Sequence, residues 1–156
     1  MIDFNRPHIT GKEMEYALQA FENAHISGDG PFTKKCNEIL EKVLNAKKVL
    51  LTTSCTHALE LSALLLNIQP DDEVIVPSFT FVSTINAFVL RGAHPVFVDI
   101  RPDTLNVNET LIENRITERT KAILPVHYAG VGCEMEAIQE IANRNHIPIV
   151  EDNAHG

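Results

Sequence analysis

The sequence has few of the residues that build disulfide frameworks, thiolate metal sites or membrane spans. Its 156 residues include three cysteines, at Cys36, Cys55 and Cys133, and no tryptophan. The cysteines form no Cys-x-x-Cys pair, so no disulfide framework is predicted and a reducing compartment, the cytoplasm, is favoured. No apolar run approaches the roughly 18 residues that span a bilayer, and the polar start MIDFNRPHITGKEMEY lacks the apolar segment of a secretion signal.

Positive charge is also scarce. Lysine and arginine total 13 against 21 aspartates and glutamates, which gives a formal net charge of −8. This acidic balance argues against a nucleic-acid or anionic-membrane surface, although it permits a local anion site. The seven histidines form no His-x-His or His-x-x-x-His pair beside a carboxylate, so we expect no metal site.

What the sequence does contain is a regular alternation of strand and helix patterns. Five short runs rich in Val and Ile predict buried strands at residues 48–53, 73–77, 95–100, 121–127 and 147–151. Helical periodicity predicts helices at residues 11–24, 33–44, 56–66, 82–90, 108–115 and 134–145. Strands that alternate with helices predict an α/β fold with a mostly parallel sheet, and the length by itself is that of one domain.

Ligands of such sheets bind beyond the carboxyl ends of the strands, so the residues there are the candidates for a site. Ser54, Cys55 and Thr56 follow the first run, where a helix is predicted to begin. Unpaired N–H groups and the dipole at a helix start attract a phosphate, whereas simple capping of the helix is the alternative. Phe79 and Phe81 follow the second run and would either cover a planar ligand or pack in the core. Neither a Gly-x-Gly-x-x-Gly motif nor a P-loop motif is present.

Two further strand ends carry titratable side chains. His127 ends the fourth run, as an acid–base group or as a half-buried hydrogen-bonding residue. Asp152 follows the fifth run, where an unpaired carboxylate would be costly to bury. It would hold a cationic ring nitrogen, or it would cap a helix. A Mg²⁺ site of the receiver-domain kind is disfavoured, because in those domains the similar acidic run opens the domain.

Together, and in this order, these segments resemble the DegT/DnrJ/EryC1/StrS family of sugar-nucleotide aminotransferases, which use pyridoxal 5′-phosphate (PLP). The segments that carry the resemblance are FNRPHITGKEME, GDGPFT, LLTTSCTHALELSALLL, DDEVIVPSFTFVSTINAFVLRGAHPVFVDI, TKAILPVHYAG and IVEDNAH. The resemblance implies the three-layer α/β large domain of fold type I, of which this chain is the truncated N-terminal portion. Residues 1–45 would be its N-terminal helical segment and residues 46–156 its alternating sheet region, with the small C-terminal domain absent.

The resemblance also implies roles for individual residues. Cys55 and Thr56 match the positions that hold the PLP phosphate, and Phe81 matches the aromatic residue that stacks on the pyridine ring. Asp152 matches the aspartate that pairs with the protonated ring nitrogen. His155 stands where relatives have Gln or His near the phenolic oxygen of the cofactor.

The resemblance implies an aminotransferase that moves an amino group from glutamate to a 4-keto-6-deoxy sugar of a nucleotide sugar. A product of the dTDP-4-amino-4,6-dideoxygalactose type, for a cell-surface polysaccharide such as lipopolysaccharide or enterobacterial common antigen, is expected, as is a homodimer. The lysine that forms the Schiff base in relatives would lie beyond Gly156, so no catalytic residue is identified and residues 1–156 are expected to be inactive alone. A sugar dehydratase of the same family and a non-catalytic binding or assembly fragment are the alternatives.

Overall fold

The computed structural model describes residues 6–156, which divide into two compact units with a boundary between Leu51 and Thr52. The first unit contains helices α1 (Glu13–Glu22) and α2 (Pro31–Val43). Pro31 occupies the first turn of α2, where its missing N–H costs nothing. The rings of Tyr16 and Phe32 meet edge to face at 5.6 Å and link the two helices.

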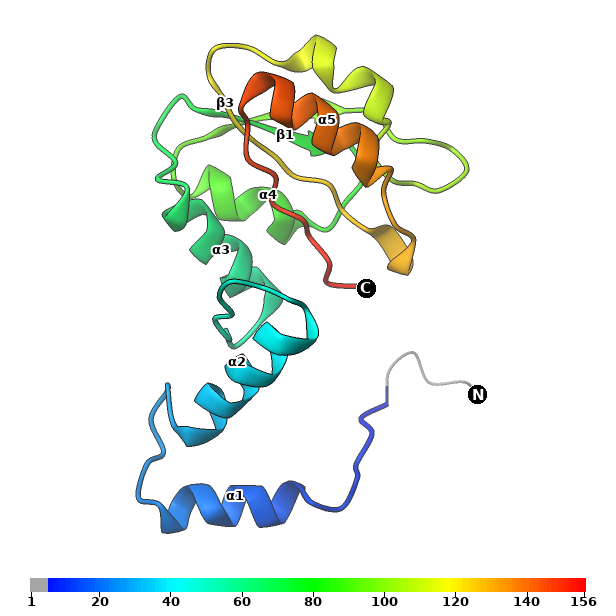
Figure 1. The fold of residues 1–156 in the computed structure, drawn as a ribbon. Coiled ribbons are helices and arrows are strands. Elements are labelled where there is room, and N and C mark those ends of the chain that lie inside the picture. Colours follow the sequence, from blue (N-terminus) through cyan, green and yellow to red (C-terminus); the bar gives the residue numbers. More distant parts are fainter. Residues whose placement is uncertain (1–5) are drawn as a thin grey trace. The chain divides into compact units, whose positions relative to one another are not determined.

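The second unit is built on a parallel sheet, coloured green to red along the chain in Figure 1. Its strands are β1 (Glu73–Pro77), β2 (His94–Val98) and β3 (Thr120–Ile123), in the order β2-β1-β3. Both pairings of β1 are parallel. Two isolated parallel bridges, Ile123 to Ile149 and Val126 to Asp152, continue the sheet beyond β3. The expected α/β class with a parallel sheet is therefore confirmed.

Helices cover both faces of this sheet, because its strands are apolar on both sides. Val74 and Val76 of β1 pack in a cluster with residues of α3 (Cys55–Leu65) and α4 (Val82–Val89). Ile75, between them, packs in a second cluster with residues of α5 (Met135–Asn145). Alternate side chains of one strand thus face opposite helical layers, which gives the second unit three layers (Figure 1).

Short 3₁₀ turns replace the helix predicted at residues 108–115. They are η1 (Glu109–Leu111) and η2 (Glu113–Arg115), and a third, η3 (Tyr128–Gly130), follows β3. The amides in the first two turns bond to carbonyls three residues earlier, as in Leu111 to Asn108. The prediction of a regular α-helix in this segment was therefore wrong.

Two predicted strands form no regular strand in the structure, and the strand predicted at residues 121–127 ends at Ile123. Residues 48–53 form no strand, because they find no ladder partner in the described part of the chain, and Leu50 and Leu51 are exposed. Residues 147–151 run beside β3 through the isolated bridges alone. Pro125 and Pro148 lack an N–H donor, which explains why the ladder there is interrupted.

Within residues 6–156, no helix is long and apolar enough to cross a membrane. Over the same range, no group of three or more His, Cys, Asp or Glu side chains is placed to hold a metal ion.

Gly92 lies in the turn between α4 and β2, and its substitution by alanine tests how tightly this turn is packed. Its φ is +91°, and a Cβ there would lie 2.9 Å from Cα of Pro70. We expect Gly92→Ala to lower the free energy of unfolding by about 1–3 kcal/mol, because the new methyl group meets backbone in a left-handed conformation. Urea denaturation measures this loss.

Gly132→Ala is the matched control. Apart from Gly132 itself and its two chain neighbours, no atom lies within 4 Å of the position that its Cβ would take. We expect its free energy of unfolding to change by no more than about 1 kcal/mol. Equal losses in the two variants would contradict the packing argument.

Candidate functional site

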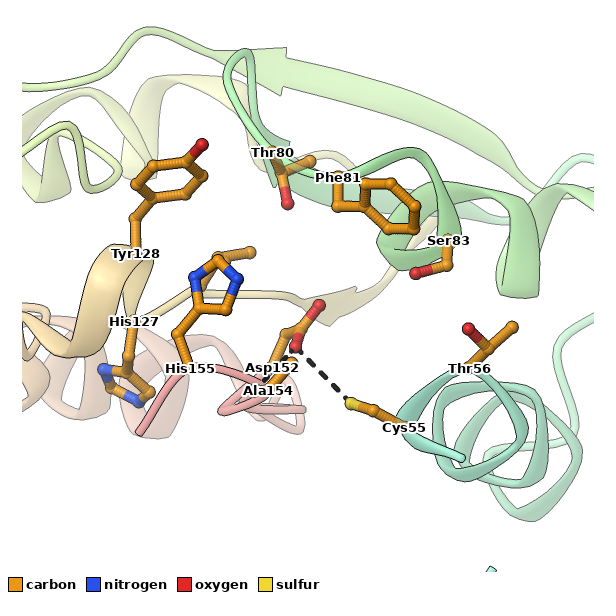
Figure 2. A pocket seen from close by; sticks show the side chains of 11 residues that line it. Cys55, Thr56, Thr80, Phe81, Ser83, His127, Tyr128, Asp152, Ala154 and His155 are labelled. Carbon is orange, nitrogen blue, oxygen red and sulfur yellow. Dashed lines mark hydrogen bonds between the residues drawn. The ribbon is translucent and has the colours of Figure 1, made fainter. Parts of the chain in front are cut away.

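A pocket of about 200 Å³ opens in the second unit where β1, β3 and the bridged segment end. Its lining residues come from four segments of the chain, and Figure 2 shows them around the pocket. The lining residues are Cys55, Thr56, Thr80, Phe81, Ser83, Val126, His127, Tyr128, Asp152, Ala154 and His155. All five residues predicted to contact a cofactor are among them. Figure 2 places Asp152 between Cys55 and His155.

The start of α3 forms one wall. The Ser54 Oγ caps this helix by accepting a hydrogen bond from the His57 N–H at 3.1 Å. Because the first amides of a helix have no intrahelical partner, the dipole end at Cys55 and Thr56 favours an anion. The first turn carries no acidic side chain that would repel one. Capping and anion binding are thus compatible at this helix start, since Ser54 performs the capping.

Asp152 is the buried charged group of the pocket, with 5% of its surface exposed. Its Oδ2 accepts a hydrogen bond from the Thr84 Oγ1 at 2.6 Å. Its Oδ1 accepts one from the Ala154 N–H at 3.2 Å and a longer one from the Cys55 Sγ at 3.7 Å, drawn as a dashed line in Figure 2. Its main chain is held as well, because its N–H donates to the Pro125 carbonyl. The carboxylate is therefore fixed by neutral donors.

The contact with Asp152 also affects the thiol of Cys55. Partial burial raises the pKa of Cys55, and the negative charge of Asp152 raises it further. Burial likewise raises the pKa of Cys133, to about 11. The Cys55 thiol therefore stays protonated and acts as a hydrogen-bond donor to the carboxylate.

Aromatic rings also line the pocket. Phe81 directly precedes α4 and is 69% exposed, so its ring does not pack in the core. The ring of Tyr128 lies 4.6 Å from that of Phe79 and 5.5 Å from that of His155. The pocket thus offers flat apolar surface beside a buried carboxylate, which suits a planar polar ligand.

Two histidines border the pocket with different surroundings. The Nδ1 of His127 accepts the Cys133 N–H at 3.1 Å, and its Nε2 lies 2.9 Å from the Glu151 carboxylate. Both ring nitrogens of this buried side chain are therefore engaged, as expected for a hydrogen-bonding residue. The Nδ1 of His155 accepts the Ala129 N–H at 3.1 Å, which leaves its Nε2 to bear the proton of the neutral ring.

A buried amide outside the pocket shapes the loop that carries Tyr128. Asn106, 2% exposed, accepts the Tyr128 N–H at 3.0 Å and donates to the Val131 carbonyl at 2.8 Å. Sequence reasoning missed Asn106, and no local pattern marks it. It also missed the hydroxyls of Thr80, Ser83 and Thr84, although their clustering at the start of a helix after a strand was a usable signal.

Comparison with known proteins finds similarity along nearly the whole chain. A family model, described as the DegT/DnrJ/EryC1/StrS aminotransferase family, matches residues 7–156. An uncharacterized protein from Methanocaldococcus jannaschii is 44% identical over 150 residues, which are 96% of this chain and 39% of that protein.

Solved structures show the same similarity. One is a protein from Streptococcus pneumoniae, assigned as a sugar aminotransferase and solved in its PMP form. It is 33% identical to this chain, and the two structures superpose with a TM-score of 0.90. The match covers 100% of this chain and 43% of that chain. NtdA from Bacillus subtilis, with bound cofactor PMP, is 37% identical with a TM-score of 0.81, over 92% of this chain and 34% of that chain. This chain therefore spans about two fifths of the length of the Methanocaldococcus jannaschii protein and of the Streptococcus pneumoniae protein.

The contact between Cys55 and Asp152 predicts a change in thiol reactivity. Asp152→Asn removes a negative charge that raises the pKa of Cys55, so more thiolate forms at mildly alkaline pH. We expect Cys55 to react with iodoacetamide about two- to tenfold faster in this variant, since one pKa unit changes the thiolate fraction about tenfold. Mass spectrometry of the alkylated peptides measures the rate.

Cys36, an exposed thiol in the other unit, is the internal control. Its rate is expected to be the same in both proteins. An unchanged rate at Cys55 would mean that Asp152 does not influence the thiol.

Proposed function

This chain belongs to the DegT/DnrJ/EryC1/StrS aminotransferase family, and from that premise we propose that the whole protein is a PLP-dependent sugar-nucleotide aminotransferase. Residues 1–156 form the N-terminal portion of its PLP-binding large domain in this proposal. Residues 1–45 are the helical segment of that domain and residues 46–156 its sheet region. The observation that carries the proposal is the pocket in which Cys55, Thr56, Phe81, Asp152 and His155 lie together.

The donors and surfaces of this pocket fit the chemical groups of PLP. A helix start without acidic side chains suits the phosphate, and the exposed ring of Phe81 suits the pyridine ring. The buried carboxylate of Asp152 suits a cationic ring nitrogen, because neither lysine nor arginine is among the residues that line the pocket within residues 6–156. The Nε2–H of His155 suits an anionic phenolic oxygen.

In this proposal each side chain has a physical task. PLP, when bound, supplies an electron sink that makes the transfer of an amino group feasible. Asp152 holds the proton on the ring nitrogen, while Cys55 and Thr56 anchor the phosphate at the start of α3. Phe81 covers a face of the ring and excludes water from it.

The proposed amino donor is glutamate, and the proposed acceptor is a 4-keto-6-deoxy sugar on a nucleoside diphosphate. A product of the dTDP-4-amino-4,6-dideoxygalactose type, used for lipopolysaccharide or enterobacterial common antigen, is the specific version, supported by the sequence resemblance alone. We propose a homodimer on the same ground, and we place the reaction in the cytoplasm because the cysteine pattern favours a reducing compartment.

A dehydratase of the same family is the second candidate function. The aminotransferases of the family use a lysine at the reacting carbon, whereas the dehydratases have a histidine in its place. No lysine is among the residues that line the pocket in the described part of the chain. From the family resemblance, we propose that this lysine lies in sequence beyond Gly156.

Asp152→Asn tests the proposed hold on the ring nitrogen in the full-length protein. The variant keeps the shape of the side chain but removes its charge. We expect the dissociation constant for PLP to rise about 10- to 100-fold, because a hydrogen bond to a charged partner contributes about 1.5–3 kcal/mol. Fluorescence titration of the apo protein with PLP measures the constant.

Asp71→Asn is the matched control for that measurement. Asp71 is exposed, and its carboxylate contacts His94. Its φ of +70° is one that asparagine tolerates. PLP binding is expected to equal that of the wild type, and an equally tight Asp152→Asn variant would remove the support for the proposed pairing.

A polypeptide of residues 1–156 is expected not to transfer amino groups, because the proposal assigns the essential lysine to later sequence. An assay that follows the conversion of glutamate to 2-oxoglutarate with a 4-keto-6-deoxy nucleotide sugar measures this. The full-length protein is the positive control. Turnover by residues 1–156 would overturn the assignment of that lysine.

A further inference from the structure

We propose that Thr80 and Thr84 form a hydroxyl relay that positions the Asp152 carboxylate and leaves one of its acceptor sites for a ligand. Thr84 is then a positioning residue, because it acts on the ligand through Asp152. The inference rests on the proposed function, since the ligand that it assigns is the protonated ring nitrogen of PLP.

The direction of the first hydrogen bond follows from the chemistry of the carboxylate. The Thr84 Oγ1 lies 2.6 Å from Oδ2 of Asp152. An ionised carboxylate only accepts hydrogen bonds, so the single hydroxyl proton of Thr84 is donated to Asp152. Thr84 is fully buried, so water does not compete for that proton.

The direction of the second bond follows from the first. The Thr80 Oγ1 lies 2.9 Å from the Thr84 Oγ1. Because Thr84 has already given its proton to Asp152, Thr80 must be the donor of this pair. The protons of both hydroxyls therefore point toward the carboxylate, and Thr80, which lines the pocket, is the outer end of the relay. Such chains strengthen each of their hydrogen bonds.

The remaining acceptor capacity of Asp152 can then be counted. A carboxylate has about four acceptor sites, two on each oxygen. Oδ1 accepts from the Ala154 N–H and from the Cys55 thiol, and Oδ2 accepts from Thr84. One site on Oδ2 is left over from these contacts. A buried acceptor of this kind is stabilised by one further donor, and the protonated ring nitrogen of PLP offers one N–H.

The relay therefore limits how the carboxylate can turn. Without the Thr84 hydroxyl, Oδ2 would lose its donor, and the side chain would rotate to meet the ligand or water in several ways. The hydroxyl of Thr84, rather than its bulk, would then determine how well Asp152 holds the ring proton.

Variants of the full-length protein test this assignment. Thr84→Val keeps the shape but removes the hydroxyl, Thr84→Ser keeps the hydroxyl, and Thr80→Val removes the outer donor. Thr110→Val is the control, because Thr110 is exposed and its hydroxyl bonds to Asn108. Two readouts are taken: the dissociation constant for PLP, and the ¹⁵N NMR shift of PLP labelled at its ring nitrogen, which reports whether that nitrogen is protonated.

We expect Thr84→Val to weaken PLP binding about 10- to 100-fold and to shift the ¹⁵N signal toward the unprotonated ring. Thr80→Val is expected to weaken binding about 3- to 10-fold, as the loss of a neutral hydrogen bond does. Thr84→Ser and Thr110→Val should bind PLP within about threefold of the wild type, a difference below 1 kcal/mol.

Several outcomes would overturn the relay. One is a Thr84→Val variant that has the wild-type dissociation constant for PLP and the wild-type ¹⁵N shift. Another is a Thr84→Ser variant that binds PLP as weakly as Thr84→Val, since packing alone would then explain the loss of affinity. If Thr84→Val does not fold, Thr80→Val decides, because wild-type binding by that variant would overturn the relay and weaker binding would support it. A wild-type protein that binds no PLP would instead refute the proposed function, and the relay with it.

Discussion

A carboxylate buried at the end of a parallel sheet must be surrounded by hydrogen-bond donors, and this requirement organises the second unit around Asp152. The donors come from separate elements: Cys55 from α3, Thr84 from α4, and the Ala154 amide from the segment that follows Asp152. Each element must reach the same point, so the hydrogen-bonding needs of one side chain constrain where α3 and α4 begin over the sheet.

The main chain of Asp152 is held by hydrogen bonds of its own. The Asp152 N–H donates to the Pro125 carbonyl, and the Asp152 carbonyl accepts the His127 N–H. The main chain of Asp152 is thereby fixed by the sheet, while its side chain is fixed by the helices. Because the Asp152 carboxylate is held from both sides, it needs little reorganisation when a charged ligand binds. This is the condition for electrostatic preorganisation.

Much of this arrangement could be predicted from local pattern. The strand at residues 73–77 has the predicted bounds, and α5 begins within one residue of its prediction, because periodicity and apolar runs are local signals. Residues predicted for the site do line one pocket. Phe81 follows β1 and Asp152 is bridged to the segment after β3, whereas Cys55 and Thr56 begin α3 without a strand before them. The partners of Asp152 could not be predicted in this way. Thr84 is 68 residues from Asp152, and no periodic pattern reports such a contact. The strand expected at residues 48–53 failed for a related reason, since a strand exists only with a partner.

The side-chain amide of Asn106 holds the main chain of one pocket wall, the loop that carries Tyr128. Both of its hydrogen bonds go to main-chain atoms, the Tyr128 N–H and the Val131 carbonyl. These two hydrogen bonds therefore hold the loop whatever side chain stands at position 128. Evolution can exchange Tyr128 for another residue and alter what the wall recognises while its course stays the same. Loss of Asn106 would instead remove both of these main-chain contacts, while the side chains that the loop displays stay the same.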